Sequence, residues 1–135
     1  MKKLFLILLS TMSLILAACG GGGSSSDSSS GDTFNGAQTI VVLGESSDSS
    51  FVMSIDGTTA TILDEDFTAS GTLNGANFTV NVPPFSFTED GLTCVFDITY
   101  NGSLVSETRV EGTISGSGVC DGVNLPISGT FAANS

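Results

Sequence analysis

Carboxylates are the main proton-carrying side chains that this 135-residue chain offers for catalysis. The sequence has no histidine, and its only lysines are Lys2 and Lys3 at the N-terminus. Ser-His-Asp and Cys-His arrangements are therefore impossible within the chain. Two acidic clusters, residues 64–66 and 89–90, could supply the carboxylate pair of a glycosidase. Both clusters lie at predicted turns, so we favour solvated surface charge and expect neither an enzyme nor a catalytic residue.

The first of these clusters also raises the possibility of a metal site. Asp64 and Asp66, together with a turn carbonyl, offer the hard oxygen ligands that Ca²⁺ prefers. Their spacing fails the EF-hand pattern, because its glycine and its distal glutamate are missing. Asp64 and Asp66 are therefore only weak calcium candidates, and we expect no metal and no other cofactor.

An apolar leader precedes the acidic clusters. Lys2 and Lys3 are followed by residues 4–16, which are apolar apart from a few hydroxyl residues. The run is shorter than the roughly 20 apolar residues that span a bilayer. A short positive start, an apolar run and small closing residues are typical of a secretory signal peptide. A retained membrane helix is the alternative.

The leader ends in the motif Leu16-Ala17-Ala18-Cys19, which resembles the lipobox of bacterial lipoproteins. The resemblance implies that residues 1–18 are removed and that Cys19 carries acyl chains, palmitate among them, on its sulfur and on its new amine. Two or more acyl chains hold a protein on a membrane where a single chain binds only marginally. In the enterobacterial pattern an aspartate at position 20 retains a lipoprotein at the inner membrane. Gly20 therefore favours the outer membrane, by resemblance only.

A polar segment follows the lipobox. Residues 20–33 are glycine, serine, aspartate and a single threonine, with no apolar side chain to offset the entropy of ordering them. We therefore predict a signal peptide over 1–18, a lipidated cysteine and Gly/Ser tether over 19–33, and one β-domain over 34–135.

The charge of the mature chain excludes two classes of partner. Removal of the leader takes away two lysines and changes the formal net charge from −11 to −13, which leaves Arg109 as the only strong base. Nucleic-acid phosphates and anionic lipid head groups repel such a surface. We expect contact with the membrane through the lipid anchor, no nucleic-acid binding, and an envelope protein or a glycan as the open choice of partner.

From residue 38 onward the sequence alternates between apolar and polar residues, and Asn-Gly and Asp-Gly pairs separate the runs, which is typical of β-hairpins. The predicted strands are 38–43, 50–55, 58–63, 67–74, 77–82, 85–88, 92–100, 104–119 and 123–132. No window keeps a helical period. We predict an all-β antiparallel meander that closes into a small barrel or folds into a two-sheet sandwich. An open meander would leave two edge strands with unpaired backbone N–H and C=O groups.

Alternation also assigns the side chains to faces. The predicted inward residues are Phe78, Val80, Val82, Leu92, Cys94, Phe96, Ile98, Tyr100, Leu104, Val110, Ile114, Val123, Leu125, Ile127, Gly129 and Phe131. We expect the phenylalanines to form the core, with an apolar ligand pocket as the alternative, and Tyr100 to close that core with its hydroxyl in water. A two-residue turn at Asp121-Gly122 would set Ile114 opposite Gly129 and Phe131 opposite Gly112.

Cys94 and Cys120 form an even pair in an exported chain, which favours a disulfide over two free thiols. A metal site is disfavoured because no histidine and no third cysteine could complete it. A turn predicted at Asn101-Gly102, with a bulge, would place Cys94 opposite Val110, far from Cys120. The disulfide then requires that residues 116–118 break the strand predicted over 104–119 and fold Cys120 back.

Three functions remain open. The first is a lipid-anchored envelope lipoprotein that acts as a non-enzymatic interaction or structural module. The second is a calycin-like barrel that binds a small apolar ligand, and the third is a carboxylate-dependent glycan hydrolase. The Gly-Thr and Ser-Gly pattern of ASGTLNGANFTVNV also resembles the small β-domains of many bacterial lipoproteins, a resemblance that implies no particular function.

Overall fold

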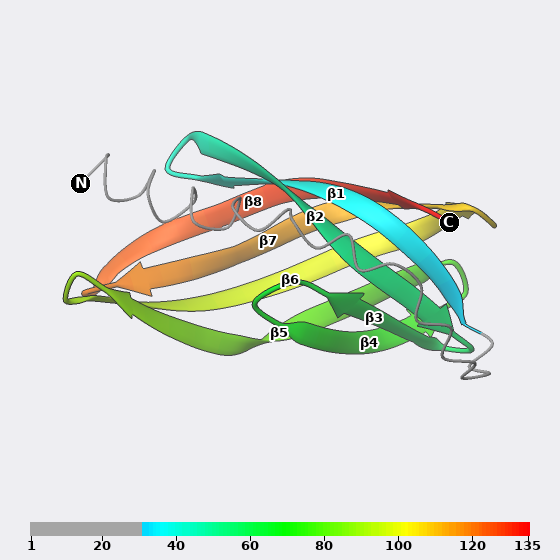
Figure 1. Cartoon of the computed structure of the whole chain (residues 1–135), viewed down its shortest axis with the longest axis horizontal. Helices are drawn as coiled ribbons and strands as arrows, with labels where there is room; N and C mark the ends of the chain where they lie inside the picture. The colour runs from blue at the N-terminus through cyan, green and yellow to red at the C-terminus, as the bar shows by residue number, and fades with distance from the viewer. Residues whose placement is uncertain (1–30) are drawn as a thin grey trace, which may run out of the picture. The chain divides into compact units, whose positions relative to one another are not determined.

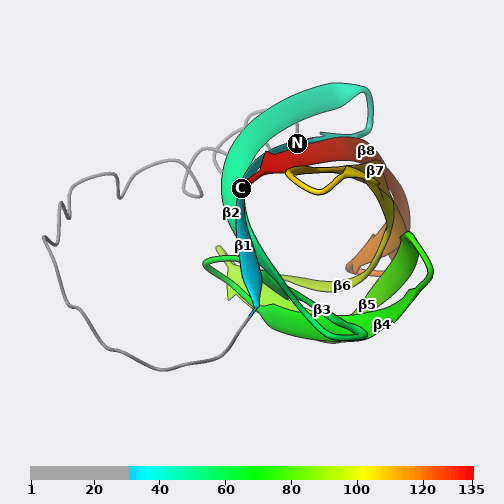
Figure 2. The ribbon, with the colours of Figure 1, turned by 90° about the vertical axis from the view of Figure 1, so that its right-hand side faces the viewer.

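The computed structural model describes residues 31–135, apart from the side chains of Phe87 and Glu89. Each strand pairs antiparallel with the next in sequence, and the first pairs with the last, so the sheet is a closed barrel (Figures 1 and 2). The strands are β1 (Asp32–Val42), β2 (Glu45–Asp56), β3 (Thr59–Leu63), β4 (Thr68–Asn74), β5 (Asn77–Glu89), β6 (Leu92–Ser106), β7 (Arg109–Cys120) and β8 (Val123–Asn134). The all-β prediction is confirmed in its barrel form.

Tight turns join most of the strands. The exception is the connection between β3 and β4, which is a loop over residues 64–67. Asp121 and Gly122 both adopt positive φ, at 47° and 81°, as the two central residues of a type I′ turn must. The predicted register of β7 with β8 is confirmed, since Ile114 pairs with Gly129 and Gly112 with Phe131.

The turn predicted at Asn101-Gly102 is wrong. Strand β6 runs through both residues to Ser106, and the chain reverses instead at residues 107–108. A Cβ atom built on Gly102 would lie only 2.5 Å from the Phe78 ring and 2.7 Å from the Phe131 ring. This glycine therefore makes room for two aromatic rings rather than for a turn, and the bulge falls further along, between Leu104 and Ser106.

The predicted break at residues 116–118 and the pairing of Cys94 with Val110 are also wrong. Strand β7 continues to its end, where Cys120 lies directly opposite Cys94, and Val110 pairs with Leu104. A Cβ built on Gly116 would lie 2.1 Å from the carbonyl oxygen of Asp97 on β6. The glycine therefore allows close contact between two strongly curved strands, a role that it has in small barrels.

Several strand boundaries also differ from the prediction, and β2, predicted over 50–55, begins at Glu45. Residues 77–82 and 85–88 belong to one strand, β5, and Pro83-Pro84 causes a register shift against β6 between Val82 and Phe85. Proline cannot donate to the ladder, so the chain accommodates the pair as an irregularity within the strand. At the N-terminal end of the β-domain, β1 begins at Asp32, within the segment predicted as tether.

Aromatic side chains fill the middle of the barrel. The Phe131 ring lies 5.8 Å from that of Phe51, 6.2 Å from Phe78 and 5.5 Å from Tyr100, measured between centroids. Most of the predicted inward residues are buried, but Val123 is 59% exposed because it stands at the very start of β8. In eight-stranded barrels of this size, side chains can occupy the whole interior.

Candidate functional site

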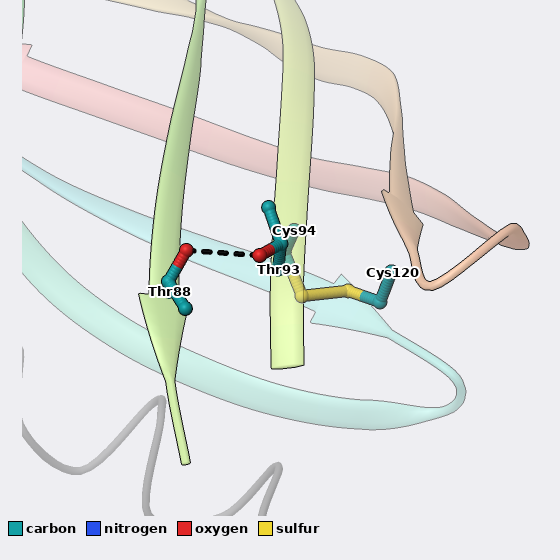
Figure 3. The surroundings of a disulfide bond; sticks show 4 residues. All are labelled: Thr88, Thr93, Cys94 and Cys120. Carbon is teal, nitrogen blue, oxygen red and sulfur yellow. Dashed lines mark hydrogen bonds between the residues drawn. A yellow bond between two sulfur atoms is a disulfide. The ribbon is translucent and has the colours of Figure 1, made fainter. Parts of the chain in front are cut away.

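A disulfide joins two adjacent strands near one end of the barrel. Cys94 on β6 and Cys120 on β7 are bonded, with their Cα atoms 4.1 Å apart (Figure 3). On the neighbouring pair of strands, the hydroxyls of Thr88 and Thr93 form a hydrogen bond of 2.9 Å. The predicted disulfide is therefore present, and it is reached by direct strand pairing. Cys19, the predicted lipidation site, lies outside the described residues.

Asp64 and Asp66, the weak calcium candidates, lie in the loop between β3 and β4. The two oxygens of Asp64 accept hydrogen bonds from the Gln38 side-chain amide at 3.0 Å and from the Asp66 backbone amide at 3.4 Å. Among residues 31–135, no three His, Cys, Asp or Glu side chains gather closely enough to hold a metal ion. The Asp64 carboxylate therefore faces a partner inside the protein, and a calcium role stays a prediction.

The residue opposite Asp64 defines a polar cluster inside the barrel. Gln38 is 2% exposed and, Tyr100 apart, is the one buried polar residue among the side chains that the structure describes. Its Nε2 donates to Ser49 Oγ and to Asp64 Oδ2, both at 3.0 Å, and its Oε1 accepts from the Tyr100 hydroxyl at 2.8 Å. Tyr100 is fully buried, so the expectation of a hydroxyl in water is wrong. We call Gln38, Ser49, Asp64 and Tyr100 the interior polar cluster.

Burial controls the electrostatics of this cluster. Desolvation raises the pKa of Asp64 above its ordinary value, and the charge of Asp66 adds to the rise, while hydrogen bonds from the Asp66 and Glu65 backbone and from Gln38 oppose it. Burial, and then the nearby Asp64 charge, raise the pKa of Tyr100. Tyr100 therefore stays protonated at neutral pH and acts as a donor to Gln38.

The loop that carries Asp64 also inserts an aromatic ring. Phe67 stacks on Phe85 at 6.1 Å and lies 6.1 Å from Tyr100, and Phe85 stacks in turn on Phe96 at 5.5 Å. A hydrogen bond from the Asp64 amide to the Phe67 carbonyl, at 2.9 Å, closes the loop. The loop is thus fixed to the barrel by both a carboxylate and a ring.

A second feature lies on the outside of the barrel, between β4 and β5. These strands pair only through residues 72–74 and 77–79. A hollow of about 380 Å³ lies at this junction, and we call it the β4–β5 groove. Its lining residues are Ser70, Gly71, Thr72, Asn74, Asn77, Phe78, Thr79 and Asn81. None of them carries a charge, and all the polar ones are exposed.

Comparisons with known proteins give no relative for this chain. The chain matches no family model, no curated protein and no solved structure. Within residues 31–135 the structure holds no helix with the length and apolarity to span a membrane. The class that the structure defines is a closed antiparallel barrel of eight strands with one disulfide.

The sequence analysis predicted neither the interior polar cluster nor the β4–β5 groove. Gln38 stands at an inward position of β1, between the buried residues Phe34 and Val42, and a polar residue in such a series was the available signal. The groove depends on how few residues β4 and β5 share in their ladder, which no local pattern of residues reveals.

Proposed function

We propose that this protein is a lipid-anchored lipoprotein of the bacterial cell envelope and that its barrel is a non-enzymatic interaction or structural module. The leader and the lipobox ending at Cys19 support the anchor. The packing of the barrel supports the module, because large side chains such as Phe34, Met53 and Tyr100 are completely buried in its interior. A partner would then meet the outer surface.

The outer surface offers a regular row of hydrogen-bonding groups, and this observation carries the proposal. Strand register places six uncharged residues directly opposite one another in succession around the barrel, and we call them the threonine row: Thr39, Thr130, Thr113, Asn101, Thr79 and Thr72. Within the row, the Thr79 hydroxyl donates to Asn101 Oδ1 at 2.8 Å. Side chains fixed on strands lose little freedom on binding, which favours recognition by this surface.

Photocrosslinking in intact cells tests this function. A photoreactive residue replaces each member of the threonine row in turn, Thr113 among them, and a matched control replaces the exposed Glu107 in the turn between β6 and β7. We expect a discrete crosslinked product from position 113 and none from position 107. Absence of a product from every position of the threonine row would contradict the proposal.

A second candidate function is a calycin-like barrel that binds a small apolar ligand. The closed eight-stranded barrel favours it, because barrels of this strand number can hold one small ligand. Native mass spectrometry of protein purified from membranes tests it. A stoichiometric adduct that denaturation removes supports the ligand, and a bare mass counts against it.

The β4–β5 groove does not support the third candidate function, a glycan hydrolase. Hydrolysis of a glycosidic bond requires two carboxyl groups across a cleft. None of the residues that line the β4–β5 groove is acidic.

A further inference from the structure

We infer that the β4–β5 groove binds an uncharged oligosaccharide. This inference rests on the proposed function, since it names the class of partner that the outer surface recognises. The groove has about 380 Å³ of space, within the range of roughly 300 to 1,000 Å³ that small-molecule sites occupy.

The polar groups of the groove suit a polyhydroxylated ligand. Three amides, from Asn74, Asn77 and Asn81, face the same space as hydroxyls from Ser70, Thr72 and Thr79. Each amide and each hydroxyl can both donate and accept hydrogen bonds. A sugar hydroxyl also donates and accepts, so the groove can pair with several hydroxyls of a saccharide at once.

The charge of the protein selects for a neutral ligand. Fourteen Asp and Glu residues give the chain its formal charge, yet none of them lines the groove. A cation would lack a carboxylate there, and an anion would be repelled by the field of the whole protein. An uncharged, hydroxyl-rich molecule meets neither penalty.

Hydrogen bonds outside the groove fix several of its side chains. On the β6 side, Asn81 Oδ1 accepts from the Thr99 hydroxyl at 3.0 Å, and on the β3 side, the Ser70 and Thr61 hydroxyls lie 2.9 Å apart. The Thr99 contact therefore fixes the orientation of the Asn81 side chain. Such preorganisation lowers the ordering cost of binding.

The groove has no aromatic platform. Phe78 lines it but is only 3% exposed, because its ring points into the core. Without ring stacking, affinity depends on polar contacts that compete with water. We therefore expect a dissociation constant on the order of 1 mM for one oligosaccharide chain bound to the groove.

Side-chain amide NMR of the mature lipoprotein tests this inference directly. The labelled protein is held in phosphocholine micelles, so that no sugar head group competes, and is titrated with maltohexaose, cellohexaose and chitohexaose to about 10 mM, roughly ten times the expected dissociation constant. We expect saturable shifts of the Asn74, Asn77 and Asn81 amide signals with at least one of these. Oligogalacturonate, which carries carboxylates, should cause no saturable shift.

Two variants provide the matched comparison. Asn77→Ala should weaken the saturable binding about three- to tenfold, the range expected for loss of one hydrogen bond. Asn124→Ala, an exposed asparagine on β8 outside the groove, should leave it unchanged. The inference is overturned if no hexasaccharide shifts the groove amides, if oligogalacturonate shifts them equally, or if both variants weaken binding alike.

These outcomes are separable from those of the proposed function. A crosslinked partner at Thr113 without any response of the groove amides would overturn the oligosaccharide and leave the interaction module standing. A response of the groove amides without any crosslink at Thr113 would support the oligosaccharide and would contradict the threonine row as the surface that meets a protein partner.

Discussion

The hydroxyl of Tyr100 donates a 2.8 Å hydrogen bond to Oε1 of Gln38, although 62 residues separate the two in sequence. Gln38 donates in turn to Ser49 and to Asp64. One buried amide therefore links β6, β1, β2 and the loop after β3. Because buried polar groups are costly when they lose their partners, this amide should control both the stability and the pH response of the barrel.

Replacement of Gln38 by leucine should destabilise the barrel. The Tyr100 hydroxyl would be left buried without its acceptor and Asp64 would lose a donor, so we expect a loss of about 1 to 3 kcal/mol in the free energy of unfolding. Urea unfolding followed by circular dichroism measures it. Adding Tyr100→Phe to the leucine variant should recover part of the loss. An unchanged unfolding midpoint in Gln38→Leu would contradict the structure.

Asp64→Asn should stabilise the protein at neutral pH. Burial raises the folded-state pKa of Asp64, so the folded chain holds this proton more tightly than the unfolded chain does. The resulting stability is fully present below the unfolded pKa and is lost as the pH rises through the folded pKa. The variant should therefore melt at a higher temperature than wild type at pH 7, with a smaller difference near about pH 4. A difference that does not depend on pH would contradict this assignment.

Removal of the disulfide should cost a large part of the stability. Cys94 and Cys120 close a chain segment whose ends lie 26 residues apart, for which the chain-entropy estimate is roughly 3 to 4 kcal/mol. The double variant Cys94→Ala/Cys120→Ala should unfold at lower urea while keeping its β-sheet circular dichroism. A mobility shift on reduction in a denaturing gel provides the control in wild type. Equal unfolding midpoints for the two proteins would show that the bond adds no stability.

Gly102→Ala tests the reassigned course of β6. An added methyl group would collide with the Phe78 and Phe131 rings, so we expect a loss of about 1 to 3 kcal/mol, the usual cost of overpacking a core. Thr113→Ala, on the exposed face of β7, should change stability by no more than about 0.5 kcal/mol. Equal and small effects of the two substitutions would place Gly102 at a surface turn after all.

Alternation and turn chemistry predicted much of the fold. The Asp121-Gly122 turn fixed the register of β7 and β8 correctly, because a two-residue turn leaves no freedom in the pairing. The same reasoning failed at Asn101-Gly102, where the glycine relieves crowding against the ring of Phe78, its partner on β5, and the ring of Phe131 on β8. Asp-Gly and Asn-Gly are both strong hairpin signals, and only the tertiary packing separates a turn from a site of close contact.

The candidate sites were less accessible from the sequence. The identity of the disulfide partners followed from the number of cysteines, but their direct pairing depended on the correct turn at residues 107–108. The interior polar cluster joins residues from four separate elements, so no spacing along the chain predicts it. The β4–β5 groove follows from a short ladder between two strands, a property of the closed barrel.

The N-terminal peptide of the mature protein tests the central claim most directly. Mass spectrometry of protein purified from the membranes of its own host should find a mature chain that begins at Cys19, with a diacylglyceryl group on the sulfur and an acyl chain on the amine. In a Cys19→Ala strain the acylated peptide should be absent. An unmodified Cys19, or a mature chain that begins at another residue, would contradict the account.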